Sequence, residues 1–449
     1  MKRILMPLLL VPFIILTSCS TFFDFGVAQD AYYQGDYEKA YSFLLLNSPQ
    51  IIKKQGSIVY NLDEGIVTHA TKDYKLSNIS LAKAEKAIEE NFTKSISASI
   101  GSYLINESVR DYESSFYEDI YSNIFLSLNY YHLDKIEDAM VEVRRSLEKL
   151  QLREQTLPQL KSALENQLAD NNARDVDNQL KSFDSSFYSS ALSYYLSSLF
   201  AYEYGDLDTF RISREKGEAT YKILSDYYEK NDYSSFSNLA NMDKDTSMIN
   251  FIAFSGLSPI KKTQVDRNVL VLDEYVDDNG VYHKPYYTNV VYSVPQERGS
   301  IVKSIEVLID GKKYKLEPFE NLGLIAYETM AQTCSGEYVR AYIRAVSREI
   351  AKASADASTI QEGDTSVESS LFSDIFTLFS FVAEGSGDLR SSHFFPSMSW
   401  IGTFELDPGK YDIVVNYLNS RNDIVYQEKI NNFKVTQGKA NLVEVLSAK

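Results

Sequence analysis

The sequence predicts an α+β protein, in which an all-helical N-terminal half of repeated helix pairs precedes a mostly antiparallel β domain with inserted helices. Two observations indicate this class. Up to Ser255 the apolar residues recur at helical spacing, and beyond Pro259 they alternate with polar ones. A chain of 449 residues is also too long for one small core. We therefore expect a helical domain at 19–256 and a β-rich domain at 257–449.

The first residues of the chain predict an export signal. Lys2 and Arg3 precede an apolar run, residues 4–16, which is too short to span a bilayer and ends just before Cys19. This order is typical of a bacterial lipoprotein signal, so we expect residues 1–18 to be removed and Cys19 to become the lipidated first residue. The acyl chains added there suffice for stable membrane anchoring.

Composition narrows the set of partners. The chain has 62 acidic and 45 basic residues and a net charge of −17. Such a surface repels nucleic acid and anionic headgroups, so no nucleic-acid partner is expected, and membrane attachment should depend on the acyl chains. Lipidation uses one of the two cysteines, which leaves Cys334 without a disulfide partner. A lone small thiol of this kind is expected to fill buried space.

Three helix–turn–helix units recur in the helical half. Their turns fall at Gly35-Asp36, Asp134 and Gly205-Asp206. At the same offset after the first two turns, Ala40 and Ala139 allow close helix packing, whereas Phe210 takes that place in the third unit. The pattern resembles tetratricopeptide repeats, whose units stack because none buries its apolar face alone. The polar run 157–183 carries a narrow leucine stripe and is expected to project as a helical hairpin.

Strand and turn signals fill the C-terminal half. Residues 268–275 include four consecutive aliphatic residues, as a buried strand does. Asp310-Gly311 favours the two-residue turn of a hairpin between two alternating segments. Further strands are expected on both sides of Asp407-Pro408-Gly409 and after Gly438. These segments predict an antiparallel sheet or a small sandwich.

Two helices are expected to interrupt the strands. The first, at 336–353, carries four basic residues at four-residue steps, opposite an apolar face. These residues are Arg340, Arg344, Arg348 and Lys352. The basic stripe is either a solvated or internally paired face, or a site for an acidic partner or anion. A mobile loop is expected at 353–370, and the apolar segment 371–385 is either a core helix or a surface that docks on a membrane or partner.

The sequence lacks the motifs of the common enzyme classes. It has no phosphate-binding glycine motif, no nucleophile elbow and no zinc-protease motif. Its four histidines, His69, His132, His283 and His393, are not spaced as metal ligands, so neither a metal nor a cofactor is expected. We expect a protein that is not an enzyme. A pair of catalytic carboxylates could be identified only from their separation in space.

Several segments together resemble a family of bacterial lipoproteins without an established activity. The resemblance is carried by 121–145, by 323–353 with Arg340 and Arg344, by Gly387-Asp388-Leu389-Arg390-Ser391, by Phe395-Pro396 and by Leu406-Asp407-Pro408-Gly409. It implies a lipidated cysteine, a helical half and a mixed C-terminal domain. It also implies the company of other outer-membrane lipoproteins, some of which activate peptidoglycan synthesis, and it transfers no catalytic residues.

Three functions are compatible with these features. The first is an adaptor anchored through Cys19 to the outer membrane and facing the periplasm, whose helical repeats hold an envelope protein partner, with a link to outer-membrane or peptidoglycan assembly. The second is a glycan-binding lipoprotein of a nutrient-uptake system, for which an exposed row of aromatic side chains would be evidence. The third is an envelope hydrolase with paired carboxylates.

Overall fold

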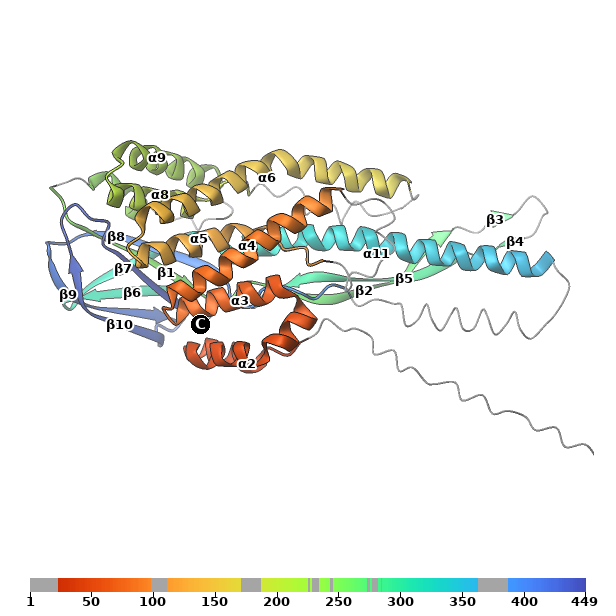
Figure 1. Cartoon of the computed structure of the whole chain (residues 1–449), viewed down its shortest axis with the longest axis horizontal. Helices are drawn as coiled ribbons and strands as arrows, with labels where there is room; N and C mark the ends of the chain where they lie inside the picture. Colours follow the sequence, from red (N-terminus) through yellow and green to blue (C-terminus); the bar gives the residue numbers. More distant parts are fainter. Residues whose placement is uncertain are drawn as a thin grey trace, which may run out of the picture.

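Helices lie over a seven-stranded sheet, and a long helix runs out from this body beside a two-stranded ribbon (Figure 1). The structure is a computed structural model that describes residues 23–97, 111–170, 187–224, 227, 234–242, 245–272, 275–276, 282–283, 285–361 and 387–449. The predicted α+β class is confirmed, with helices in the N-terminal half and a mostly antiparallel sheet in the C-terminal half.

The helical layer is built from helix pairs joined by short turns. Its elements are α1 (Gly26–Tyr33), α2 (Tyr37–Gln55), α3 (Ser57–Ala70), α4 (Tyr74–Ser97), α5 (Phe116–His132), α6 (Ile136–Asp170), α8 (Ala191–Tyr204), α9 (Leu207–Ile223), α10 (Ser234–Asn238) and the 3₁₀ turn η5 (Leu239–Asn241). The predicted turns are confirmed, because Gly35, Asp134 and Gly205 have φ of 83°, 57° and 91° between successive helices. Ala40 and Ala139 are fully buried. A tetratricopeptide arrangement of the pairs is not confirmed.

Only the first part of the polar run 157–183, which is expected to form a projecting helical hairpin, is described, and that part is helical. α6 is one 35-residue helix that continues through Pro158 as far as Asp170, and residues 171–186 lie outside the described ranges. Proline removes the hydrogen bond to the carbonyl four residues earlier. That carbonyl belongs to the exposed Glu154, so water can satisfy it and the helix continues.

The sheet has the strand order β10-β9-β6-β7-β8-β1-β11. Its strands are β1 (Met248–Ser255), β6 (Ser304–Ile309), β7 (Lys312–Pro318), β8 (Met398–Glu405), β9 (Gly409–Leu418), β10 (Ile424–Val435) and β11 (Leu442–Ser447). Neighbouring strands are antiparallel except β1 and β11, which are parallel. The hairpin predicted at Asp310-Gly311 is confirmed, with φ of 47° and 80° in its turn, and the strands predicted around Pro408 and after Gly438 are present.

The domain boundary expected at residue 256 is placed too late in the chain, because the first strand of the sheet, β1, already lies before it. β1 is buried throughout and lies inside the sheet, between β8 and β11. A strand buried on both faces has no alternation to distinguish it from a buried helix, which explains the error. One hydrophobic cluster extends from Phe25 to Ala448 and joins the helices to the sheet, so the two segments share a core.

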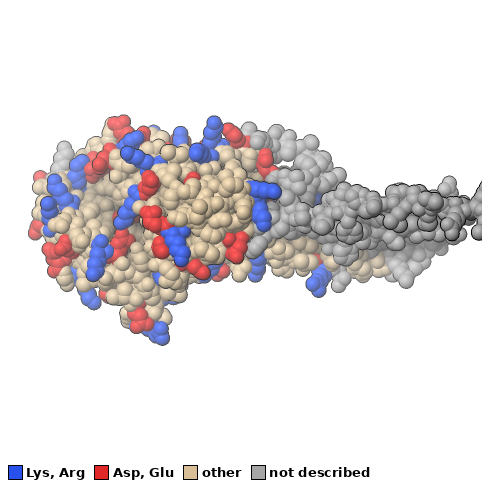
Figure 2. Space-filling view, turned by 60° about the horizontal axis from the view of Figure 1, so that its bottom comes forward, with Lys and Arg blue, Asp and Glu red and all other residues tan. Residues whose placement is uncertain are grey.

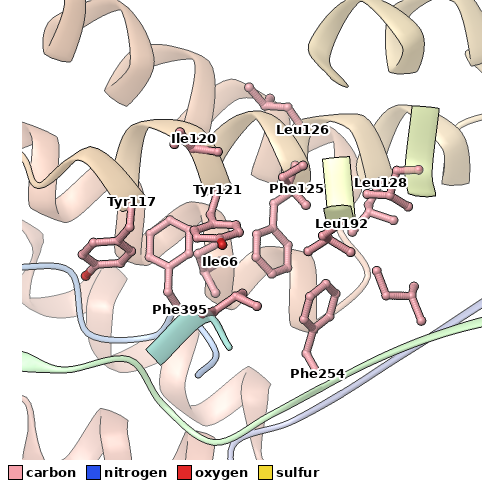
Figure 3. Close-up of a cluster of buried hydrophobic side chains, with 14 of the residues drawn as sticks. Ile66, Tyr117, Ile120, Tyr121, Phe125, Leu126, Leu128, Leu192, Phe254 and Phe395 are labelled. Carbon is pink, nitrogen blue, oxygen red and sulfur yellow. The ribbon is translucent and has the colours of Figure 1, made fainter. Parts of the chain in front are cut away.

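Helix α5 runs through the middle of this core. The ring of Phe125 lies 4.9 Å from His69 of α3, 5.2 Å from Phe254 of β1 and 6.0 Å from Phe395. Figure 3 shows the side chains of α5 facing Phe254 and Phe395 from the strand and loop below them. Aromatic contacts of this kind therefore hold three distant parts of the chain together.

Residues 387–396, here called the strap, form no helix or strand but are buried almost throughout. A buried irregular segment needs partners for its backbone groups. The N–H of Ser392 donates to Glu118 at 2.8 Å, and the N–H of His393 donates to Asp63 at 2.6 Å. Arg298 donates to the carbonyl of His393 at 2.7 Å. Buried side-chain charges thus fix the strap between the helices and the sheet.

The inserted helix is longer than expected. α11 (Leu322–Gln361) continues into the predicted mobile loop at 353–370, whose first nine residues are helical. The rest of that loop and the apolar segment 371–385 lie outside the described residues. In the part of the chain that the structure covers, no helix combines the length and apolar character needed to cross a bilayer.

Candidate functional site

An arm extends from the body and is made of α11, β2 (Ile260–Leu272) and β5 (Tyr286–Gln296). Figure 1 shows the arm running well beyond the sheet, with the short pair β3 (Tyr275–Val276) and β4 (Tyr282–His283) at its far end. At 1.5 Å per residue, the 40 residues of α11 measure about 60 Å. The arm therefore presents surface far from the main core.

The surroundings of α11 change along its length. Up to Cys334 its buried side chains belong to the core of the body. From Tyr338 to Ala345 they instead pack on Val290 and Tyr292 of β5, in a separate cluster. The rings of Tyr292 and Tyr338 meet edge to face at 4.7 Å. Since a two-stranded ribbon is only marginally stable alone, this contact with α11 is what stabilises it.

The ribbon itself has features of a binding edge. β2 and β5 pair with each other along their length, and among the described residues neither has a further ladder partner. β5 contains no charged residue in 11 positions, whereas 24% of the whole chain is charged. Outer strands usually carry charges that prevent pairing with other chains. An uncharged outer strand suits the addition of an extended segment from a partner.

A buried ion pair joins the ribbon to α11 at the root of the arm. The Lys261 ammonium donates to Glu337 at 2.6 Å, and both side chains are almost fully buried. Burial alone would lower the pKa of Lys261, but the Glu337 carboxylate outweighs it and the pKa is raised. Ser293 of β5 donates to the second oxygen of Glu337. All three side chains are therefore fixed, and the root is a rigid joint.

Cys334 lies in the same cluster, 3.3 Å from the hydroxyl of Ser293. Because Ser293 donates its proton to Glu337, the Cys334 thiol is the donor in this contact. Burial raises the pKa of Cys334 to about 12. The prediction of a buried cysteine is confirmed, and the thiol stays protonated and unreactive at neutral pH.

Two further ion pairs lie near the root. Arg390 of the strap donates twice to Asp388, at 2.8 and 2.6 Å, and burial of Asp388 is outweighed by this contact, so the pKa of Asp388 is lowered. Arg340 of α11 donates to Glu113 at 3.1 Å. Asp388 and Arg390, two of the residues on which the resemblance rests, therefore pair with each other and stabilise the conformation of the strap.

Of the four side chains in the predicted basic stripe, the structure describes those of Arg340 and Arg344. Arg340 is 8% exposed and ion-paired, so it is turned toward the body and is not on a solvated face. Arg344 is half-buried. The backbone of Arg348 and Lys352 is helical, as expected, but their side chains lie outside the description, as does Cys19. The role of the stripe in binding an anion or partner remains a prediction.

Three of the four histidines contact carboxylates that are distant in sequence. Glu444 of β11 accepts from His69 and from His132, each at 2.6 Å, and it is almost fully buried. His393 contacts Asp63 at 2.8 Å. Among the described residues, no three His, Cys, Asp or Glu side chains converge to hold a metal ion. Nothing in the sequence links these partners, because each pair combines elements from opposite ends of the chain.

A groove of about 530 Å³ lies between α4 and α6. Its lining residues are Ala82, Glu85, Lys86, Glu89, Arg145, Glu148, Lys149 and Leu152. The Lys149 ammonium is paired within the protein, since it donates to Glu85 at 2.8 Å and to Asp119 at 2.6 Å. Figure 2 shows the same mixture on a larger scale: on that face acidic and basic side chains alternate and uncharged areas separate them. The charges of the groove are thus balanced internally.

No protein-family model matches this chain, and neither a curated protein nor a solved structure matches it.

Proposed function

We propose that this protein is a lipid-anchored scaffold of the cell envelope, which binds an envelope protein through its arm and is not an enzyme. Lipidated Cys19 holds it at the outer membrane, facing the periplasm. The helix pairs of the body, arranged like tetratricopeptide units, form the platform from which the arm extends. The observation that carries the proposal is the arm itself, with its separate core and its uncharged outer strand.

The rigid root supports this function. A binding element must keep its geometry until the partner arrives, because ordering it during binding would cost affinity. The buried pair of Lys261 and Glu337 and the Ser293 contact fix β2, β5 and α11 relative to one another. The arm is therefore preorganised for a partner that adds a strand or packs on its exposed side chains.

The distribution of aromatic side chains favours protein binding over glycan binding. Trp400 is buried, and the exposed tyrosines of the described chain are Tyr188, Tyr204, Tyr287 and Tyr327. Tyr204, Tyr287 and Tyr327 belong to three different elements and Tyr188 precedes α8, so these tyrosines form no row on one surface element. Stacking of a sugar needs neighbouring exposed rings, so the support for a nutrient-uptake protein is weak.

Photocrosslinking from the arm tests the proposal. Tyr287 on β5 and Tyr204 on α8 are 53% and 51% exposed, so they make a matched pair for replacement by a photoreactive phenylalanine. We expect a single envelope protein to be joined to the Tyr287 position in cells and not to the Tyr204 position. The same protein should co-purify with the unmodified chain and be lost in a Tyr287→Arg variant. Equal capture at both positions would contradict binding through the arm.

The anchor is tested separately. A Cys19→Ala chain cannot be lipidated, so we expect it to leave the membrane fraction and to incorporate no labelled palmitate, whereas a Ser20→Ala chain should behave like the parent. Unchanged membrane attachment of the Cys19→Ala chain would overturn the lipid anchor while leaving the arm proposal intact.

A further inference from the structure

We propose that the outward face of α2 lies on the lipid surface to which Cys19 is anchored, so that the body rests on the bilayer in one orientation. This inference rests on the proposed function, because it takes the anchor at Cys19 as given. It goes further by naming the surface that touches the lipid.

The apolar residues of α2 occur on two faces. One face is buried in the body and carries Ala40, Leu44, Ile51 and Gln55. The largely opposite face carries Leu45, Leu46, Pro49 and Ile52, of which Leu46 is 81% exposed. Leu45 and Leu46 lie four and three positions before Pro49, and Ile52 lies three positions after it, so these side chains adjoin one another on successive turns. A surface helix normally turns polar residues outward, whereas here large apolar side chains also lie on the exposed face.

This stripe stands out from the rest of the described surface. Leu45, Leu46 and Ile52 are exposed large apolar side chains within eight residues of one helix. On the other described helices, such side chains are spread more widely, as with Ile212 and Ile223 of α9. Single exposed apolar residues need no explanation, but a contiguous group marks a contact surface.

The position of the anchor identifies the occupant as lipid. Phe23, the first described residue, packs beside α2, with its ring 6.2 Å from that of Phe43. Cys19 lies four positions earlier, and four fully extended residues span at most about 14 Å. The acyl chains attached to Cys19 must therefore enter the bilayer within this distance of Phe23. The membrane surface must then pass close to α2.

The charges flanking the stripe fit a headgroup region. Three exposed basic residues, Lys39, Lys53 and Lys54, lie on α2 on either side of the apolar residues along the helix, against one exposed acidic residue, Glu38. Ammonium groups at these positions can meet lipid phosphates while the apolar side chains enter the boundary between headgroups and acyl chains. In a chain with a net charge of −17, this helix is suited to lie on a membrane.

Environment-sensitive fluorophores test the inference on the full lipidated protein. A single cysteine is introduced by Leu46→Cys or, as the control, by Ile223→Cys, whose parent side chain is 67% exposed on α9. Native Cys334 does not compete for the label, because it is buried and its pKa is raised to about 12. Each labelled protein is inserted into vesicles of phosphatidylethanolamine and phosphatidylglycerol, with and without a nitroxide-labelled lipid.

We expect blue-shifted emission and several-fold stronger nitroxide quenching at position 46 than at position 223. Vesicle-bound protein with both probes in water would overturn the docking of α2 and leave the anchor standing. Absence of vesicle binding would overturn the anchor and the docking together. A blue shift at position 46 without vesicles would show that a second copy or a protein covers the stripe, and would also overturn the inference.

Discussion

The body and the arm differ in how their polar and apolar groups are held. In the body, one cluster joins Phe25 to Ala448, a second lies on the other face of the sheet, and buried carboxylates such as Glu118 hold backbone groups of the distant strap. In the arm, eight buried residues form a separate cluster, and the Lys261–Glu337 ion pair joins the ribbon to α11 at the root. Cooperative units with few buried contacts open locally before the whole protein unfolds. We therefore expect the body to unfold as one unit and the arm to open on its own.

The largest effect should follow from damage to the centre of the body. Phe125→Ala removes a ring that touches α3, β1 and the strap, and truncation of a buried Phe costs about 3–5 kcal/mol of the free energy of unfolding. Denaturant unfolding should show this loss for the whole body. The half-exposed Val141 provides a control, since its change to Ala should cost less than about 0.5 kcal/mol. Equal costs would mean that α5 is not central to the body.

Damage to the root should stay within the arm. Lys261→Met leaves Glu337 buried without its cation, which costs about 3–5 kcal/mol in the part of the fold that depends on the pair. Hydrogen exchange should show loss of protection in β2 and β5 and unchanged protection in α3 and α5. The double change Lys261→Met with Glu337→Leu should restore most of the protection in β2 and β5, because no unpaired buried charge remains. Loss of protection in the body as well would break the proposed independence of the arm.

A smaller effect is expected at the β6–β7 hairpin of the body. Gly311 has φ of 80°, and a Cβ added there would meet no atom within 4 Å. Gly311→Ala should therefore cost only the strain of a left-handed residue, about 1–2 kcal/mol. Because the hairpin belongs to the body, thermal unfolding of the body should shift while the arm keeps its protection. A change confined to the arm would contradict the separate unfolding of the body and the arm.

The smallest expected effect is a pH dependence of the stability of the body, which comes from the cluster of His69, His132 and Glu444. Burial would lower the pKa of His69, but its contacts with Glu444 and Asn129 outweigh burial, so the pKa is raised. Burial would raise the pKa of Glu444, but its contacts with His69 and His132 outweigh burial, so the pKa is lowered. The His69 contribution to stability is complete below its unfolded pKa of about 6.5 and is lost as the pH rises through the folded pKa. The Glu444 contribution is complete above about 4.3 and is lost as the pH falls. Stability from this cluster is therefore greatest between these values.

Unfolding free energies measured from acidic to mildly alkaline pH check this window. In a His69→Gln variant, the decline above about pH 6.5 should be shallower than in the parent. Lys72→Gln, at the nearby exposed pair with Glu428, should keep the parent slope. An unchanged slope in the His69 variant would show that this ring does not carry a proton in the folded body.

Local signals were sufficient to predict much of the fold. The turns at Gly35 and Gly205 and the Asp310-Gly311 hairpin depend on residues that tolerate positive φ, so the sequence alone identifies them. β1 was missed because a strand buried on both faces loses its alternation. The site was harder to predict: the root joins Lys261 to Glu337 across 76 positions, and no local pattern records such a pairing.

The last strand of the sheet has a consequence for how the protein is made. β11 pairs with β1, and Glu444 receives His69 and His132 from 375 and 312 positions earlier. While the ribosome still covers β11, these helices lack the Glu444 counterion and the sheet lacks one of its edge strands. The newly made polypeptide therefore cannot reach its final compact form until this strand has been released and has paired with β1.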